Sequence, residues 1–160
     1  MEYRTVFDIA TAGFKSWDFP AFGLPFIAIG ILLVANRKNL PSWWYKGPKE
    51  RAVFPFVFLG LALLWTLFTF ASTYTEYRSL ASSVGKAQVV EGLVRNFKGM
   101  PPNGHGMETF CVSRACFEYS DYSIVAGFNN TATRGGPIRE GRPVRITYVG
   151  NSILKLEIAK

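Results

Sequence analysis

Residues Ala52–Thr75 have the sequence AVFPFVFLGLALLWTLFTFASTYT, and no charged side chain interrupts them. A second uncharged stretch, FPAFGLPFIAIGILLVAN, covers Phe19–Asn36. A helix that crosses a bilayer needs about 20 apolar residues, with a range of roughly 17 to 25. Inside hydrocarbon the backbone must satisfy its own hydrogen bonds, which a helix does. We therefore predict two transmembrane helices that form a hairpin.

The alternative is a pair of buried helices in a soluble bundle. Such helices usually carry a polar face at 3.6-residue spacing, and neither stretch shows one. The residues outside the two stretches are also too few to surround both helices. Membrane spanning is therefore the preferred interpretation, and the lipid bilayer is the first expected partner.

Aromatic residues flank both predicted spans. Trp and Tyr favour the depth of the lipid headgroups, because one edge of each ring is apolar and the other bonds water. We expect this interfacial position for Trp17, Trp43, Trp44, Tyr45, Tyr74 and Tyr77.

The formal charge of +7 is unevenly distributed along the chain. The loop between the spans, residues 37–51, has five Lys or Arg and one acid, whereas residues 87–160 have nine Lys or Arg and six acids. The positive-inside rule then predicts a cytoplasmic loop with both termini outside. A nucleic-acid-binding protein would concentrate its charge on the folded domain, so nucleic acid is not the expected partner. Residues 1–18, expected to be an N-terminal tail, lack the apolar run of a signal peptide.

The second helix is expected to continue past the bilayer surface as a stalk. Its apolar positions recur at spacings of three and four residues, at Tyr74, Tyr77, Leu80, Ala81 and Val84, and Gly85 is suited to end it. The hairpin and stalk together cover residues 19–84, and a C-terminal β domain covers residues 87–160.

After Gly85 the apolar pattern changes to period two, which is typical of strands. The predicted strands are Gln88–Phe97 with a bulge or bend at Gly92, Glu108–Val112, Ala115–Tyr119, a weaker one at Tyr122–Phe128, Pro143–Val149 and Ile153–Ile158. Five or six short strands favour a small, partly closed antiparallel β-barrel similar to an OB fold. Two curled antiparallel sheets are the alternative. The predicted class is an α+β membrane protein.

Cys111 and Cys116 are the sharpest local feature of the β domain. If Ser113 and Arg114 form a two-residue turn, the cysteines face each other across the hairpin, with Cβ atoms about 4.5–5.5 Å apart. A disulfide prefers about 3.5–4.5 Å, so a bridge needs a modest adjustment, and an oxidising compartment would favour it. The alternative is two reduced cysteines that pack as small hydrophobes. One histidine elsewhere leaves too few soft ligands for a metal, so we expect no metal or other cofactor.

The C-terminal domain also resembles a known group of proteins. The runs VVEGLVRNF, GH, ETF, FEYSDY, GFN, GGPIREG and VRITYVGNSILKLEI are similar to a recurrent domain of uncharacterised bacterial membrane proteins with two helices. The resemblance covers residues 87–158, and the preceding helical hairpin is similar too. It implies the two-helix architecture and a bacterial envelope setting, and it implies no activity. Together with the sidedness inferred from charge, we expect a multi-pass protein of the inner (cytoplasmic) membrane with a periplasmic or otherwise extracytoplasmic C-terminal domain.

His105, the single histidine, lies three residues before Glu108. One interpretation makes them an acid–base or metal pair on a loop. The preferred interpretation is a histidine that is solvated or braces its loop, because general acid–base catalysis needs a positioned partner and a pocket.

Two further clusters are candidates for a ligand or partner surface. Tyr119, Asp121 and Tyr122 would suit a groove for sugars or peptides, although Ser-Asp at a strand end more often forms a turn. The arginines of the Gly-rich connection and the following strand either attract anionic headgroups or pair with acids such as Glu140. These arginines are Arg134, Arg139, Arg142 and Arg145.

Three hypotheses of function follow. The first is a non-enzymatic, membrane-anchored cell-envelope protein whose extracytoplasmic β domain binds a protein, an envelope component or a second copy of itself. The second is a thiol/redox or hydrolytic envelope enzyme that uses Cys111, Cys116 or His105. The third is a cytoplasmic OB-like binder of nucleic acid or anionic ligands, which requires the domain to face the cytoplasm.

Overall fold

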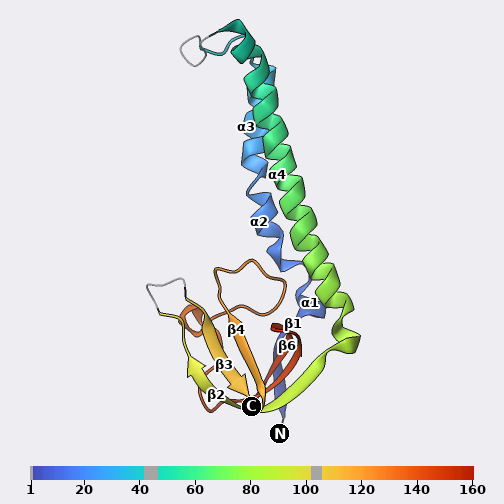
Figure 1. Cartoon of the computed structure of the whole chain (residues 1–160), viewed down its shortest axis with the longest axis vertical. Helices are drawn as coiled ribbons and strands as arrows, with labels where there is room; N and C mark the ends of the chain where they lie inside the picture. Colours follow the sequence, from blue (N-terminus) through green and yellow to red (C-terminus); the bar gives the residue numbers. More distant parts are fainter. Residues whose placement is uncertain (1, 42–46, 102–105) are drawn as a thin grey trace. The chain divides into compact units, whose positions relative to one another are not determined.

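The computed structural model describes residues 2–41, 47–101 and 106–160 (Figure 1). The chain divides into two compact units, of which one is Ser16–Thr73 and the other is Met1–Lys15 together with Tyr74–Lys160. The first unit is helical and the second contains an antiparallel sheet. The predicted α+β class is therefore confirmed.

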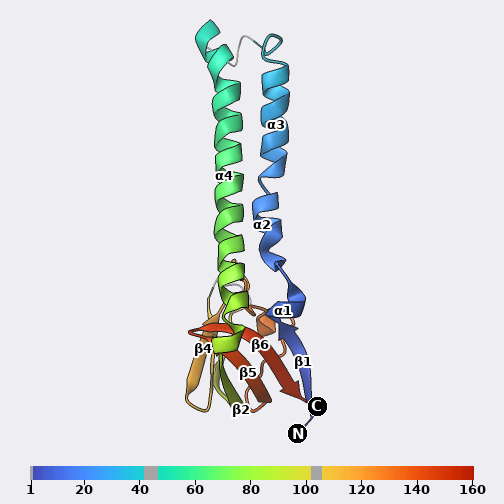
Figure 2. The same cartoon turned by 90° about the vertical axis from the view of Figure 1, so that its right-hand side faces the viewer.

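The helical unit is a hairpin with two long arms. The first arm consists of η1 (Lys15–Trp17), α2 (Asp18–Ala21) and α3 (Leu24–Ala35), and the second arm is α4 (Pro48–Ser82), which continues into the other unit. Helices α3 and α4 lie side by side and run antiparallel (Figure 2). Both arms are long and apolar enough to cross a membrane.

The first arm is interrupted at Phe22 and Gly23, whereas a single helix is predicted there. Pro25 explains the interruption, because proline has no N–H to donate to a carbonyl of the preceding turn. The Gly23 amide donates to the Pro20 carbonyl at 3.0 Å, and α3 begins with Pro25 in its first turn. The second arm starts earlier than predicted, so Pro55 lies inside α4.

Two glycines allow the arms of the hairpin to approach closely. A Cβ added to Gly30 would lie 3.0 Å from the Cα of Leu59, and one added to Gly23 would lie 3.0 Å from the Cβ of Thr66. The two contacts are one heptad apart on both arms. Small residues at such positions are typical of helix pairs that pack by close backbone approach.

A narrow seam on α4 corrects the expectation that the stretch has no polar face. The seam recurs at alternating steps of four and three residues, and its less exposed positions are Pro55, Leu59, Ala62, Thr66, Thr69 and Thr73. The threonine hydroxyls donate to carbonyls of their own helix, for example Thr66 to Ala62 at 2.8 Å and Thr73 to Thr69 at 2.8 Å. The C-terminal half of this seam is therefore polar without carrying any charge.

Six strands of the described chain form one antiparallel sheet in the order β1-β6-β5-β2-β3-β4. They are β1 (Tyr3–Asp8), β2 (Gln88–Lys98), β3 (Glu108–Val112), β4 (Ala115–Tyr119), β5 (Pro143–Val149) and β6 (Ser152–Ala159). Strands β1 and β4 are the two edges, so the sheet is open. Strand pairing between described residues does not close the predicted barrel.

The first strand lies in residues that were expected to be a tail. β1 pairs with β6, so that Tyr3 lies opposite Ala159 and Thr5 lies opposite Glu157. It is followed by the short helix α1 (Ile9–Ala12), whose Ile9 is buried. The start of the chain therefore belongs to the same unit as the C-terminal strands.

The predicted hairpin about Ser113 and Arg114 is confirmed. Strands β3 and β4 pair about the turn Ser113-Arg114, with Val112 opposite Ala115, and β5 pairs with β6. Strand β2 pairs first with β5 and then, from Val94, with β3. Of the bulge or bend predicted at Gly92, the bulge is not found, because Gly92 lies opposite Val144 in an unbroken register with β5. The register shift of β2 lies between Arg95 and Lys98, against β3.

Loop 120–142 replaces the predicted strand Tyr122–Phe128. The loop contains η4 (Ala132–Arg134) and extends beyond the strands at the end where α1 lies (Figure 1, brown). It contributes Phe128 and Ile138 to the main core. The other buried members of that core come from the strands: Val94, Phe110, Val112, Phe117, Tyr119, Val144, Ile146, Ile153, Leu156 and Ile158.

The end of α4, residues Tyr74–Ser82, forms the predicted stalk and is followed by η3 (Val84–Lys86). Its Tyr77 and Leu80 pack against a second, smaller core made of Ile9, Ala126 and Leu154. Through these contacts the stalk becomes part of the β unit.

Asn151, in the β5–β6 turn, occupies the place of a further strand beside β4. Its side-chain amide accepts a hydrogen bond from the Glu118 N–H at 3.0 Å and donates one to the Glu118 carbonyl. One position of an otherwise free edge is thereby satisfied, which is a common way to limit unwanted strand pairing.

Candidate functional site

A buried Glu108–Tyr119 pair lies at the base of loop 120–142. Glu108 is 0% exposed and Tyr119 is 6% exposed. The Tyr119 hydroxyl donates to one carboxylate oxygen of Glu108, and the Ala132 N–H donates to the other at 2.9 Å. Both oxygens are thus engaged inside the protein, so the pair joins β3 and β4 to the start of η4.

The environment keeps Tyr119 in its donor form. Burial, and then the hydrogen bond to Glu108, raise the pKa of the Tyr119 hydroxyl above its ordinary value. A buried carboxylate without its donors would be costly. The geometry therefore indicates a brace for the loop.

The predicted pairing of His105 with Glu108 stays a prediction, because His105 lies outside the described residues. Within residues 2–41, 47–101 and 106–160, no three His, Cys, Asp or Glu side chains are grouped as metal ligands would be.

Asp121, Tyr122 and Arg134 form a cluster on the loop. Arg134 Nε lies 3.1 Å from Asp121 Oδ2, and the Arg134 guanidinium lies over the Tyr122 ring at 5.7 Å from its centre. Arg134 also donates to the Tyr122 hydroxyl at 3.3 Å. This cluster combines an aromatic ring with a cation at the surface, since the Arg134 side chain is 61% exposed.

The structure does not bring the remaining candidate arginines together. Arg139 donates to the carbonyls of Gly136 and Ile138, and Arg142 donates to the Pro137 carbonyl at 2.9 Å. These bonds hold the turn of the loop. The expected pairing with Glu140 is not seen, because a Glu140 oxygen accepts from the Phe97 N–H at 2.7 Å.

Arg145 lies on the face of the sheet that points away from the core, because its neighbours Val144 and Ile146 point into the core. It donates to Glu91 at 2.9 Å and covers the Tyr3 ring at 4.3 Å. The hydrogen bond from Tyr3, and then that from Arg145, lower the pKa of Glu91. This exposed network connects β1, β5 and β2.

Cys111 and Cys116 face each other across the β3–β4 hairpin as predicted. Their sulfur atoms are 2.08 Å apart, which is the distance of a disulfide. Cys116 is exposed and Cys111 is partly exposed. A groove of about 350 Å³ runs past the two sulfurs, with polar side chains at Asn96, Thr109, Glu118 and Asn151. We call it the disulfide groove.

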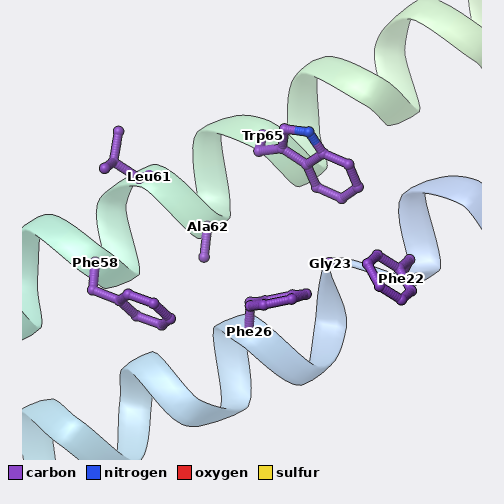
Figure 3. A pocket seen from close by; sticks show the side chains of 7 residues that line it. All are labelled: Phe22, Gly23, Phe26, Phe58, Leu61, Ala62 and Trp65. Carbon is purple, nitrogen blue, oxygen red and sulfur yellow. The ribbon is translucent and has the colours of Figure 1, made fainter.

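A second cavity, of about 360 Å³, lies between the arms of the hairpin (Figure 3). Its walls are apolar and aromatic side chains from both arms: Phe22, Gly23, Phe26, Phe58, Leu61, Ala62 and Trp65. The interruption of the first arm at Phe22 and Gly23 borders this cavity. Its chemistry suits hydrocarbon groups and provides no acid or base.

The structure describes some of the aromatic residues that are predicted at the membrane interface. Trp17 is 63% exposed, and Tyr74 and Tyr77 both contact Phe14, with ring centres 5.6 and 5.8 Å apart respectively. Trp43, Trp44 and Tyr45 lie outside the described residues.

Two contacts beside the ends of the helical unit were not predicted from the sequence. Glu76 accepts a hydrogen bond from the Ala126 N–H at 3.2 Å, and Lys15 Nζ donates to Asn129 at 2.7 Å. The only local signal was an acid that directly follows the uncharged stretch, at Glu76. These contacts attach loop 120–142 to the two segments that lead into the helical hairpin.

Comparisons with models of protein families, with curated proteins and with solved structures find no match for this chain. The resemblance to two-helix bacterial membrane proteins stays a prediction. Function must therefore be argued from the geometry alone.

Proposed function

We propose that this chain is a non-enzymatic, membrane-anchored protein of the cell envelope, whose β domain lies outside the cytoplasm and binds a protein or an envelope component. The observation that carries the proposal is the exposure of the apolar helices. In the most apolar window of each candidate span, only 17% and 11% of the residues are buried.

The exposed side chains of the helices are large and apolar. Phe68 is 74% exposed, Leu64 is 66% exposed and Phe22 is 65% exposed. Soluble monomers rarely expose contiguous apolar patches larger than a few hundred Å², so a hydrocarbon solvent suits this surface. The threonine hydroxyls of α4 bond within the helix, as a lipid environment requires.

The pairing of β1 with β6 supports two crossings of the membrane. Residues 3–8 and 152–159 must lie on the same side of any membrane, because they are hydrogen-bonded in one sheet. The chain between them must then cross an even number of times. Two candidate spans meet this requirement.

Sidedness is inferred from charge and from the cysteines. The five Lys or Arg of residues 37–51 favour a cytoplasmic loop. A partly exposed cysteine pair at disulfide distance fits an oxidising compartment better than the cytosol. Both arguments favour an inner-membrane protein with a periplasmic β domain.

The disulfide groove is the surface that we infer for the partner. It offers an amide at Asn96, a hydroxyl at Thr109 and a carboxylate at Glu118 around an exposed cysteine pair. Such groups suit a partner that presents hydrogen-bonding groups, such as an extended peptide. The arginines described above bond to groups of the protein itself, so nucleic acid is not proposed.

Labelling with a membrane-impermeant thiol reagent tests the anchor and its sidedness. One variant carries an added cysteine after Lys160 and another carries Asn39→Cys in the exposed loop. In intact spheroplasts we expect the reagent to label the C-terminal cysteine, and to label Asn39→Cys only after permeabilisation. The reverse pattern, or recovery of the unlabelled chain in the soluble fraction, would overturn the proposal.

Photo-crosslinking in native membranes tests the groove. A crosslinking amino acid is placed at Thr109 or Glu118, and at Val89 as a control, since Val89 is exposed on another strand. We expect one shared adduct from the two groove positions and none from Val89. Identical adducts from all three positions would show contact without specificity.

A second candidate function, a thiol–disulfide component of the envelope, is favoured by the exposure of Cys116 within the groove. It predicts that the double variant Cys111→Ser, Cys116→Ser loses cellular function. Val144→Ala, which removes buried methyl groups without touching the cysteines, serves as the control. Equal loss in both variants would reduce the effect to stability and reject this candidate.

A further inference from the structure

Loop 120–142 is attached to both segments that join the sheet to the apolar helices. Lys15, which directly precedes the helical unit, donates to Asn129 at 2.7 Å. Glu76, three residues after that unit ends, accepts from the Ala126 N–H at 3.2 Å. At a rise of 1.5 Å per residue, Glu76 is only about 4.5 Å along the helix from Thr73.

The segment between Tyr119 and Ala126 exposes side chains of interfacial chemistry. Tyr122 is 48% exposed and Ile124 is 43% exposed, and both lie in the loop. Arg134, which lies over the Tyr122 ring, adds an exposed cation. Tyrosine, an aliphatic side chain and arginine together are the composition that favours the headgroup region of a bilayer.

Aromatic side chains pack together close to Lys15 and Glu76 in the sequence. Phe14, one residue before Lys15, contacts Tyr74 and Tyr77 on the stalk. An aromatic cluster at this depth is the usual anchor of a membrane protein at the water interface. Lys15 and Glu76, which hold the loop, therefore lie within a few residues of the aromatic side chains that we expect at the membrane–water interface.

We propose that residues 120–125 of the loop form, through the exposed side chains of Tyr122 and Ile124, a lipid-contacting surface that rests on the headgroups beside the two spans. This inference rests on the proposed membrane anchor. The surface gives the β domain a direct contact with the bilayer, in addition to the two places where the chain continues into the proposed spans. The domain is then held at a defined distance from the membrane, with its disulfide groove on other strands.

Quenching by nitroxide lipids tests this surface in the full-length protein. Single cysteines, Ile124→Cys, Val89→Cys and Leu64→Cys, are labelled with an environment-sensitive fluorophore, without reductant so that the native pair stays unlabelled. Val89 is the matched control, because it is an exposed aliphatic residue of β2 (62%), and Leu64 reports on the anchor (66%). Each protein is reconstituted in phosphatidylcholine–phosphatidylglycerol vesicles with headgroup or acyl-chain nitroxides.

We expect strong quenching at Leu64 by acyl-chain nitroxides, and quenching at Ile124 by headgroup nitroxides that is several-fold greater than at Val89. Quenching at Leu64 with Ile124 no different from Val89 would overturn the loop surface while retaining the anchor. Absence of quenching at Leu64 would overturn the anchor, and the loop surface with it. Tyr122→Cys provides a second reporter on the loop, and thermal unfolding confirms that each variant is folded.

Discussion

The close approach of the two helical arms at Gly30 provides a quantitative test of the hairpin. A Cβ on Gly30 would lie 3.0 Å from the Cα, Cβ and Cδ1 of Leu59. A backbone atom cannot move away as a side-chain end can, so Gly30→Ala must push the arms apart by a few tenths of an ångström. Gly60 lies on α4 with nothing within 4 Å of its added Cβ, which makes Gly60→Ala the matched control.

The two substitutions share one effect and differ in the other. In a helix, alanine is favoured over glycine by roughly 0.5–1 kcal/mol, and both variants gain this amount. Overpacking costs about 1–3 kcal/mol and applies to Gly30→Ala alone. We therefore expect Gly30→Ala to be less stable than Gly60→Ala by about 1–3 kcal/mol, because the common gain cancels.

Tryptophan fluorescence can report on the hairpin separately from the sheet. All four tryptophans of the chain, Trp17, Trp43, Trp44 and Trp65, lie within Ser16–Thr73. Unfolding by a denaturing detergent in mixed micelles, followed by this signal, therefore measures the helical unit. Hydrogen exchange of the amides in β2, β5 and β6, measured by mass spectrometry, follows the sheet in the same samples.

Equal or greater stability of Gly30→Ala relative to Gly60→Ala would refute the close contact between the arms. A loss that appeared only in the sheet signal would refute it as well, because the substitution lies in the helical unit.

Three further predictions concern the β unit. Gly136→Ala should destabilise the β unit by at least about 1–3 kcal/mol, because the new Cβ would lie 2.0 Å from a backbone oxygen. Gly85→Ala, whose new Cβ meets open space, should not destabilise it. Chemical denaturation compares the two variants. The pKa of Tyr119 is raised above its ordinary 10.0. The stabilising effect of the Tyr119 hydroxyl should therefore be complete below pH 10 and decline above it. The difference in unfolding free energy between the protein and Tyr119→Phe should narrow as the pH rises past 10, and a constant difference would contradict this. Reducing the Cys111–Cys116 pair should lower the unfolding free energy by up to about 2 kcal/mol, since the closed loop is short. Unfolding with and without reductant measures this loss, and alkylation followed by mass spectrometry confirms the reduction. An unchanged unfolding free energy would contradict the prediction.

The features predicted correctly depend on neighbours in the sequence. The β3–β4 hairpin follows from two alternating runs on either side of a two-residue turn, so the register of Cys111 with Cys116 could be derived from spacing. The long apolar helices follow in the same way from composition. In both cases the partner residues are within a few positions of each other, or the property belongs to one segment.

The features that were missed depend on distant partners. Nothing in residues 3–8 indicates that their partner is the last strand, so β1 could not be distinguished from a tail. The segment Tyr122–Phe128 has the composition of a strand, but the Ala126 N–H bonds to the stalk instead of to a neighbouring strand.

The candidate site shows the same division. Glu108 and Tyr119 were chosen as surface residues, yet both are buried, because the loop folds over them and places the Ala132 N–H on the carboxylate. Arg139 and Arg145 are close in sequence but have different partners, because Arg139 bonds to carbonyls of its own loop and Arg145 bonds to Glu91 on β2. Only the path of loop 120–142 decides which of these side chains meet.

The pairing of β1 with β6 also has a consequence for the order of assembly. Strand β1 leaves the ribosome before its partner β6 and must wait while residues 9–151 are synthesised. Until then β6 is absent, and β1 has unsatisfied backbone groups that can recruit other polypeptides. We therefore expect a chaperone or rapid docking to protect β1 during biogenesis, and deletion of β1 or of β6 to have the same phenotype.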